Sequence, residues 1–220
     1  MTEYKRSVVV VEDDSFLRSL IADSIEAAGF SVSTAANAAD ARRVINAVDP
    51  DAVVLDIDLG IGPNGFDIAD AIRAQSDDTS IVFLTALPDP RFAGREDKAV
   101  YKNAAYLNKH LLEDADTLIS ALEAVLTERS ITKFRHHEDE NRPFAHLSRT
   151  QIQVLQLLAE GKTNQQIADA RQRSLAATES AITRTLEALH IDSSADVNVR
   201  VVAAREYLTQ VGTPSREKSK

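Results

Sequence analysis

Short apolar runs alternate with amphipathic segments through the first 126 residues of the chain. Four runs consist mainly of β-branched or small apolar residues and begin at Val8, Ala52, Ile81 and Ala104. A fifth run, residues 31–35, alternates polar and apolar side chains. Runs this short without alternation predict strands that are buried on both faces, as in a parallel sheet covered by helices. The pattern therefore predicts an α/β fold with a doubly wound, five-stranded parallel sheet.

Apolar residues at helical spacing separate these strands. The predicted helices cover residues 17–28, 38–48, 66–74, 91–100 and 113–126. Gly29 and Pro50 follow the first two helices and act as stop signals. Strands and helices that alternate in this way are typical of doubly wound domains. We expect a first domain over residues 1–126.

Residues 127–146 show no sustained apolar period and include the polar run from His136 to Pro143. This composition predicts a solvated linker between two domains. The adjacent His136 and His137 could suggest a metal site. Neighbouring residues on a flexible strand seldom converge on one ion, so the linker interpretation is favoured.

The remainder of the chain has only helical patterns. Ser148 with Gln151, and Thr163 with Gln166, form two capping boxes that open two short helices. Further helices are predicted over residues 176–189, with Ser174 as cap, and 195–208. Two short helices followed by a longer one form a helix-turn-helix arrangement. We expect a second, all-α domain over residues 147–210 and a polar tail over residues 211–220.

Composition excludes several classes of protein. The chain has no cysteine, which excludes disulfides and thiolate metal sites and fits a reducing cytosol. It shows neither a signal peptide nor the ~20 consecutive apolar residues of a membrane span. We therefore expect a cytoplasmic protein with no membrane partner. The net charge of −9 argues against general nucleic-acid affinity for the whole chain.

The charge is unevenly distributed. Residues 1–126 hold 11 Lys and Arg against 22 Asp and Glu, a net charge of −11. Residues 145–220 hold 10 against 8, a net charge of +2. The second domain is thus only marginally basic, which weakens any inference of DNA binding from charge alone.

Polar and charged residues follow the predicted strands where each strand ends. Glu12 and Asp13 follow the first strand, Asp56 the third, and Thr85 and Lys109 the fourth and fifth. The carboxyl ends of parallel strands meet at one edge, where ligands bind. Carboxylates, a hydroxyl and an ammonium at this edge suit a divalent cation, Mg²⁺, and a phosphoryl group. Asp14 is expected to be only a helix N-cap.

The segments VVVVEDDSFLR, VVLDID, FLTA and AYLNK, in this order, resemble the receiver domain of two-component response regulators. The resemblance implies a flavodoxin-like fold and a protein that is not an enzyme. It implies that Asp56 is the phosphoacceptor for a sensor histidine kinase. Thr85 and Lys109 would contact the phosphoryl oxygens.

The same resemblance implies the metal ligands and the switch. Asp13 would be a direct Mg²⁺ ligand, Glu12 would hold the ion mainly through water, and Asp58 would contribute its backbone carbonyl. Tyr106 would be the aromatic side chain that moves together with Thr85.

Two features depart from the family pattern. His110 follows Lys109 where receivers usually have a proline in a cis peptide, so we expect a trans peptide that holds Lys109 less tightly. The loop of residues 59–65 is one residue longer than usual and lacks its early proline.

An enzyme alternative is open at this point. Asp56-Ile57-Asp58 after an apolar strand resembles the nucleophile motif of haloacid-dehalogenase-type phosphatases. In that family, however, the nucleophile usually follows the first strand. Here the acidic pair Glu12 and Asp13 follows the first strand, and Asp56 follows the third. The receiver interpretation is therefore favoured.

The segments LSRTQIQVLQLLAEGKTNQQIA and LEALHI resemble the LuxR/NarL-type helix-turn-helix output domain. By this resemblance the third helix would present Glu179, Ser180, Thr183 and Arg184 to the major groove of double-stranded DNA. Most other matching positions are explained as core or caps, so they indicate the fold and not DNA binding.

The expected DNA contacts fit the family poorly, because it commonly has lysine at the positions of Glu179 and Thr183. The cations left for phosphate contacts are Lys162, Arg171, Arg173, Arg184 and Arg200. Two outputs stay open: control of transcription through DNA binding, as a homodimer when phosphorylated, or a protein-interaction or dimerisation module that has lost DNA binding. The fourth helix, with Val199, Val202 and Tyr207, is equally consistent with a dimer surface and with domain core.

Overall fold

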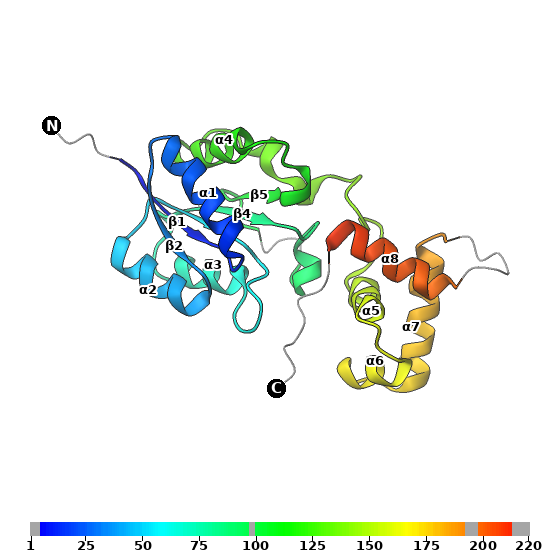
Figure 1. Ribbon diagram of the computed structural model, residues 1–220. Helices are drawn as coiled ribbons and strands as arrows, with labels where there is room; N and C mark the ends of the chain where they lie inside the picture. Colours follow the sequence, from blue (N-terminus) through cyan, green and yellow to red (C-terminus); the bar gives the residue numbers. More distant parts are fainter. Residues whose placement is uncertain (1–4, 97–99, 192–197, 213–220) are drawn as a thin grey trace. The chain divides into compact units, whose positions relative to one another are not determined.

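The computed structural model describes residues 5–96, 100–191 and 198–212 (Figure 1). Its contacts divide the chain into two units, which we describe separately. The first unit comprises the described residues of 5–87 and 100–139. The second comprises residues 88–96 and the described residues of 140–212. The predicted polar tail lies outside the described residues from 213 onward.

The first unit is built on a five-stranded sheet whose strands are all parallel. The strands are β1 (Ser7–Val11), β2 (Ser31–Ala35), β3 (Ala52–Leu55), β4 (Ser80–Thr85) and β5 (Ala105–Asn108). They lie in the order β2-β1-β3-β4-β5, so the strand order reverses between β1 and β3. In doubly wound sheets the ligand site lies beyond the carboxyl ends of the strands at this reversal. The predicted α/β fold is confirmed.

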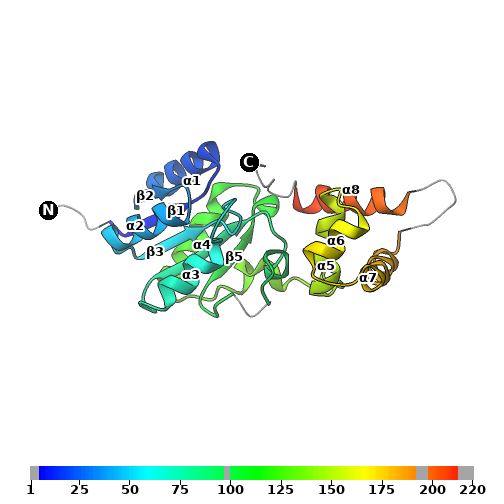
Figure 2. The ribbon, with the colours of Figure 1, turned by 90° about the horizontal axis from the view of Figure 1, so that it is seen from below.

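Four helices cover the two faces of the sheet. They are α1 (Ser15–Ala27), α2 (Ala38–Val48), α3 (Gly65–Arg73) and α4 (Ala115–Leu126). Helices α1 and α4 contact each other on one face, and α2 and α3 contact each other on the opposite face (Figures 1 and 2). Asp14 caps α1 by accepting a hydrogen bond from the Leu17 N–H at 2.8 Å, as the sequence predicts.

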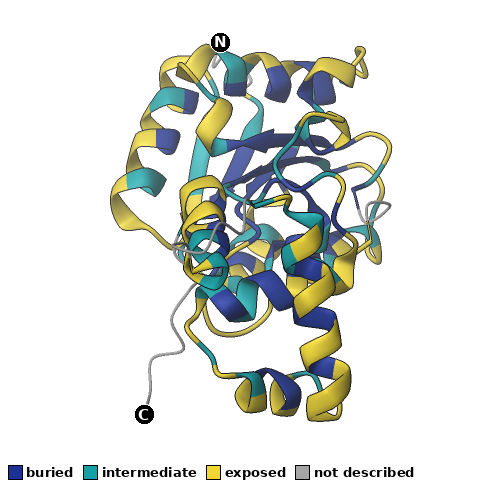
Figure 3. Cartoon of the chain, turned by 90° about the vertical axis from the view of Figure 1, so that its right-hand side faces the viewer, coloured by how far each residue is buried: buried dark blue, intermediate teal, exposed yellow. Residues whose placement is uncertain are grey.

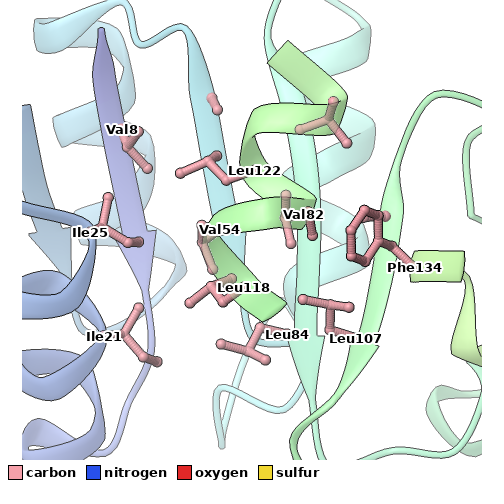
Figure 4. Packing of buried hydrophobic residues seen from close by; sticks show 14 of the residues in the cluster. Val8, Ile21, Ile25, Val54, Val82, Leu84, Leu107, Leu118, Leu122 and Phe134 are labelled. Atoms are coloured by element: carbon pink, nitrogen blue, oxygen red, sulfur yellow. The ribbon is translucent and has the colours of Figure 1, made fainter. Parts of the chain in front are cut away.

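The core under α1 and α4 is continuous across the sheet. Val8, Val54 and Val82 point from three strands toward Ile25 and Leu122 of the two helices (Figure 4). All five side chains are almost completely buried. Strands buried on both faces explain why their sequences are apolar runs without alternation.

The predicted helix over residues 91–100 is wrong. Between β4 and β5 the structure has only the short 3₁₀ helix η1 (Pro90–Ala93), and residues 97–99 lie outside the described part. Asp89 caps the start of η1, and Gly94 ends it in the left-handed conformation with φ of 72°. A glycine at this position stops the helix after one turn, because it adopts positive φ without steric cost.

The segment of residues 131–138 packs against β5, which is an edge strand of the sheet. Arg135 forms an isolated parallel bridge with Tyr106, and its guanidinium donates hydrogen bonds to the Tyr101 and Ala104 carbonyls, both at 2.9 Å. Phe134 lies beside Val82 in the core (Figure 4). The segment shields the edge of the sheet from further pairing.

The prediction that the two histidines belong to a solvated linker is therefore wrong. His137 is buried, with its ring centroid 4.9 Å from that of Tyr106. His136 Nδ1 accepts a hydrogen bond from the Asn108 N–H at 3.1 Å. The pKa of His136 is lowered by burial, although Asp139 partly offsets the effect. Hydrogen bonds between side chains and backbone hold this segment in place. Its sequence therefore needs no periodic pattern of apolar residues.

The second unit contains four helices: α5 (Arg149–Ala159), α6 (Asn164–Ala170), α7 (Leu175–Ala188) and α8 (Val199–Val211). Ser148 and Thr163 form the predicted capping boxes with Gln151 and Gln166 at the starts of α5 and α6. Helices α6 and α7 form the helix-turn-helix. The predicted all-α second fold is confirmed.

Burial in the second unit follows one face of each helix (Figure 3). Val154 and Leu158 of α5 pack with Ile167 of α6 and Ile182 of α7. Tyr207 of α8 is 2% exposed and belongs to the core of this unit. For Tyr207, the interpretation of α8 as domain core is therefore the correct one. Val199 and Val202 are half-buried.

Candidate functional site

Three carboxylates gather at the carboxyl ends of β1 and β3. Glu12 and Asp13 follow β1, and Asp56 follows β3. Glu12 and Asp56 are buried and Asp13 is exposed. One oxygen from each of the three lies within 4.8 Å of the others. This spacing suits a single divalent cation with oxygen ligands.

Lys109 brings a positive charge to the same pocket. Its Nζ lies 2.6 Å from Glu12 Oε2 and 2.7 Å from Asp56 Oδ2. The described part of the chain has no cis peptide, so the Lys109–His110 bond is trans, as expected. The Asn108 side chain accepts a hydrogen bond from the His110 N–H at 2.8 Å and fixes this turn.

The pocket carries more negative than positive charge. Burial, together with the charge of Asp56, raises the pKa of Glu12 to about 7. Burial also raises the pKa of Asp56, and Lys109 offsets only part of this effect. Burial would lower the pKa of Lys109, but the two carboxylates outweigh it and raise that pKa. The three groups titrate as one set, and a bound cation would relieve the repulsion.

The backbone on either side of Asp56 is tightly constrained. The Asp58 N–H donates to Asp56 Oδ1 at 3.1 Å, while the Asp58 side chain is exposed. Gly65 donates to the Ile57 carbonyl at 3.0 Å. A Cβ at Gly65 would lie 2.2 Å from the Asp56 carbonyl oxygen. Only glycine permits this approach, which fixes the position of the acceptor loop.

Thr85 and Tyr106 are buried next to the pocket. Thr85 Oγ1 accepts a hydrogen bond from the Leu87 N–H at 3.3 Å, and the Thr85 side chain acts to lower the pKa of Asp56. The Tyr106 hydroxyl donates to the Leu87 carbonyl at 3.0 Å. Both predicted switch residues therefore contact the same residue, Leu87.

Arg18 is a site residue that sequence reasoning missed. Its Nη1 donates to the Glu12 carbonyl at 2.6 Å and to the Asp13 carbonyl at 3.2 Å. It thereby fixes the loop that carries both carboxylates. The signal was an arginine one helical turn after the N-cap Asp14, where it can reach back to the preceding loop.

The four predicted DNA-contact residues share one exposed face of α7. Glu179, Ser180, Thr183 and Arg184 are exposed, while the opposite face of this helix is buried. The Arg184 Nε donates to the Ser180 carbonyl at 3.3 Å. The face combines one acid, one base and two hydroxyls, so its charge is balanced.

Some of the basic residues expected to contact phosphate are engaged within the unit. Arg200 donates to Asn164 Oδ1 at 2.7 Å and to the Lys162 carbonyl. The Lys162 Nζ pairs with Glu160 at 2.9 Å. Burial and the nearby charges of Arg173 and Arg184 lower the pKa of Arg171. Positive charge is therefore concentrated at Arg171, Arg173 and Arg184.

The chain matches two family models. The model described as "Response regulator receiver domain" matches residues 8–123, which is more than half of the chain. The chain is a response regulator. A second model, "Bacterial regulatory proteins, luxR family", matches residues 145–197 of the response regulator. The receiver resemblance is confirmed, and the phosphatase alternative loses its support.

Two curated relatives illustrate the similarity. Transcriptional regulatory protein PrrA of Mycobacterium leprae is 37% identical over 91 residues, which are 40% of this chain and 39% of PrrA. The match thus spans only about two fifths of the length of that relative. Transcriptional regulatory protein LiaR of Bacillus subtilis is 25% identical over 215 residues, covering 91% of the response regulator and 98% of LiaR.

Among solved structures, RcsB from Salmonella enterica serovar Typhimurium shares the fold of the response regulator. The two are 18% identical with a TM-score of 0.58, over 94% of this chain and 100% of the RcsB chain. That structure shows RcsB bound to a promoter with the phosphomimetic BeF₃⁻. In the part of the response regulator that the structure describes, no helix has the length and apolarity of a membrane span.

Proposed function

We propose that this response regulator accepts a phosphoryl group on Asp56 from a sensor histidine kinase. The observation that carries the proposal is the buried Asp56 carboxylate, which shares a pocket with Glu12, Asp13 and Lys109. A carboxylate attacks an anionic phosphoryl group only when the repulsion between them is neutralised. Lys109, within 2.7 Å of the nucleophile, supplies one of the positive charges that this requires.

The donor set fits Mg²⁺. Oxygen ligands from Glu12, Asp13 and Asp56 would hold the ion, together with the Asp58 backbone carbonyl. When bound, Mg²⁺ supplies charge neutralisation for the phosphoryl oxygens and the carboxylate. The raised pKa values of Glu12 and Asp56 support this assignment, because both carboxylates have too little compensating charge.

Thr85 and Lys109 complete the site from the ends of the neighbouring strands. The Thr85 hydroxyl favours the charged form of Asp56, which supports a role as donor to a phosphoryl oxygen on that residue. Tyr106 would move together with Thr85, because its hydroxyl donates to the Leu87 carbonyl while Thr85 accepts from the Leu87 N–H.

The experiment is labelling by a small-molecule phosphodonor in the presence of Mg²⁺. Wild-type protein is expected to take up acid-labile label stoichiometrically, and Asp56→Asn to take up none. Asp23→Asn, at an exposed position on α1, is the matched control and is expected to label normally. Equal labelling of Asp56→Asn and wild type would place the acceptor elsewhere.

We further propose that the helical unit binds double-stranded DNA and controls transcription, as a homodimer after phosphorylation. Three features support the proposal: the luxR family match, the name of LiaR as a transcriptional regulatory protein, and the exposed face of α7. Arg171, Arg173 and Arg184 would contact phosphates, where anions relieve their mutual repulsion. Val201 and Leu208 leave apolar surface exposed on α8 for a second copy.

The alternative output is a protein-interaction or dimerisation module without DNA binding. The exposed Glu179 favours it, because a carboxylate on the contact face repels phosphates. Binding of the beryllofluoride-treated protein to random duplex at several salt concentrations distinguishes the two. DNA binding predicts affinity that falls steeply with salt and a shallower slope for Arg173→Gln. Absence of salt-dependent binding would favour the alternative.

A further inference from the structure

The Lys109 ammonium reaches the acidic pocket from a tight turn at the end of β5. Lys109 opens the 3₁₀ helix η3 (Lys109–Leu111), and its Nζ lies 2.6 Å from Glu12 and 2.7 Å from Asp56. Asn108, the residue before it, is buried and ends β5. The backbone of Asn108 therefore sets the direction in which the lysine side chain leaves the sheet.

Asn108 is held through its side chain and through its backbone. Its side chain accepts a hydrogen bond from the His110 N–H at 2.8 Å, which closes the turn. Its own N–H belongs to an edge strand of the sheet and donates to His136 Nδ1 at 3.1 Å. A buried N–H without an acceptor is costly, so the histidine supplies the acceptor that the edge strand lacks.

Neighbouring residues fix the segment that carries His136. Arg135 forms a parallel bridge with Tyr106, and Phe134 is buried in the core of the first unit. These contacts are independent of the bond to Asn108. They hold the imidazole against β5.

The bond between Asn108 and His136 requires a neutral imidazole. A ring nitrogen that accepts a hydrogen bond carries no proton, whereas both ring nitrogens of an imidazolium are donors. Protonation of His136 therefore breaks the bond. Burial lowers the pKa of His136 from its ordinary value of 6.5, and Asp139 opposes this effect. The bond is thus present at neutral pH and is lost in acid.

The other charges on the same segment are engaged elsewhere. Asp139 is the one charge in the described part of the chain that shifts the pKa of His136. Arg135 and Glu138 pair with each other at 2.8 Å, and Lys133 places its ammonium over a neighbouring phenyl ring.

The titratable groups of β5 and its turn are also accounted for. The Tyr106 hydroxyl donates to a backbone carbonyl at 3.0 Å, and the Lys109 ammonium lies in the acidic pocket. The His137 ring packs against Tyr106, and the His110 side chain is exposed. The pH dependence of the bond to Asn108 therefore belongs to His136.

We propose that Asn108 and His136 are positioning residues that place the Lys109 ammonium in the Asp56 pocket. The inference rests on the proposed transfer of a phosphoryl group to Asp56. Neither residue touches the reacting atoms, and both act through the backbone of the turn. Together they take the place of the proline that receivers usually have after the lysine.

The rate at which acetyl phosphate labels the full chain in saturating Mg²⁺ tests the role of His136. His136→Ala removes the acceptor and is expected to slow labelling about fivefold, because a small displacement of a positioned group slows transfer. His136→Asn places an amide oxygen near the position of Nδ1 and is expected to label at close to the wild-type rate. His110→Ala, at an exposed histidine of the same turn, is the matched control and is expected to label normally.

Two results of this assay would overturn the proposal. One is labelling of His136→Ala at the wild-type rate. The other is an equal loss in His136→Ala and His136→Asn, because the packing of the ring and not its acceptor would then be the cause.

The Asn108 side chain is tested in the same assay. Asn108→Ala leaves the His110 N–H without its acceptor and is expected to slow labelling by a similar factor. Asn108→Ser keeps a hydroxyl acceptor at the cap and is expected to recover most of the rate. Equal rates for Asn108→Ala and wild type would show that the cap does not position Lys109.

A pH profile tests the bond without an alanine variant. Between about pH 7.5 and about pH 5 the wild-type rate is expected to fall further than that of His136→Asn, which keeps a neutral acceptor throughout. The pocket carboxylates titrate in both proteins, so their effect cancels in the ratio of the two rates. A ratio that stays constant over this range would contradict the role of His136.

Hydrogen exchange of the Asn108 amide distinguishes this proposal from the proposed function. His136→Ala is expected to speed this exchange about tenfold, the effect of one hydrogen bond of ordinary strength, whether or not Asp56 accepts phosphorus. If wild-type protein takes no label at Asp56, the proposed function fails, and the role of the pair in transfer falls with it. If wild type is labelled but His136→Ala keeps both the Asn108 protection and the labelling rate, Asp56 stands and the positioning pair is contradicted.

Discussion

Two buried charge clusters in the described part of the molecule have opposite composition. The pocket around Asp56 places two buried carboxylates against one ammonium, that of Lys109. The cluster around Asp89 places one carboxylate against two guanidiniums. Burial acts on both clusters alike, yet the pKa of Asp56 is raised and that of Asp89 is lowered.

This difference distinguishes a ligand-binding site, the pocket around Asp56, from a structural ion cluster, the one around Asp89, which we call the anchor. The Asp89 carboxylate is fully compensated by its partners, so it stabilises the fold and needs no ligand. The Asp56 pocket has too little positive charge for its buried carboxylates, and a bound cation would relieve their repulsion. A buried acid with a raised pKa is thus the better indicator of a binding site than burial or charge alone.

The largest expected effect comes from breaking the anchor. Asp89→Asn leaves two arginines buried against a neutral amide and is expected to destabilise the second unit by about 3 kcal/mol. Native-state hydrogen exchange of the α5 amides measures this free energy. Asp169→Asn, at an exposed position on α6, is the control and is expected to change it by less than about 0.5 kcal/mol. Equal effects of the two variants would contradict the assignment of an anchor.

A smaller effect is expected from removing one metal ligand. Asp13→Asn keeps the shape of the side chain but lowers the charge of the donor set. It is expected to weaken Mg²⁺ binding at least tenfold, or about 1.4 kcal/mol. Isothermal titration calorimetry measures the affinity, with the exposed Asp23→Asn as control. Unaltered affinity in Asp13→Asn would show that the acidic pocket does not hold the ion.

Removing the charge of the buried Glu12 side chain is expected to raise the free energy of unfolding, whereas breaking the anchor lowers it. The pKa of Glu12 rises from 4.5 to about 7 on folding, so its ionisation opposes folding as the pH rises through this window. Without divalent cations, Glu12→Gln is expected to stabilise the first unit by about 1 kcal/mol at pH 8 and to have little effect near pH 4.5.

Chemical denaturation in a chelator across this pH range measures the difference. Glu26→Gln, at an exposed position on α1, provides the control and is expected to show no such pH dependence. Destabilisation by Glu12→Gln at pH 8 would mean that Lys109 already compensates the pocket, and the contrast between the two clusters would disappear.

The smallest effect is expected at an exposed ion pair. Arg43 lies 3.3 Å from Asp40 on α2, and the two side chains are 74% and 43% exposed. Arg43→Gln is expected to change the free energy of unfolding by less than about 0.5 kcal/mol, because solvent screens the pair. Thermal denaturation measures it. A loss comparable with that of Asp89→Asn would show that burial does not set the energy of these clusters.

The sequence predicts the elements that have strong local signals. The β-branched runs mark the strands, and Ser148 and Thr163 mark the starts of α5 and α6 through their capping boxes. The pocket follows from the fold, because the carboxyl ends of parallel strands bring Asp56 and Lys109 together from positions far apart in the chain.

The sequence does not predict the elements that are stabilised by distant partners. Residues 91–100 do not form the predicted helix over their described part, because Asp89 and Phe92 are held by residues more than 50 positions away. His137 lies in a polar run that predicts exposure to solvent, but it is buried against Tyr106. In both places, tertiary contacts decide the structure, and the local composition carries no trace of them.

Phosphorylation as proposed requires that a carboxylate oxygen of Asp56 form the bond to phosphorus. The most direct measurement is borohydride reduction of the protein after treatment with a phosphodonor and Mg²⁺, followed by peptide mapping. Reduction converts an aspartyl phosphate to homoserine, and homoserine is expected at position 56 alone. Homoserine at position 13 or 58, or unmodified Asp56 in protein that carries acid-labile label, would contradict it.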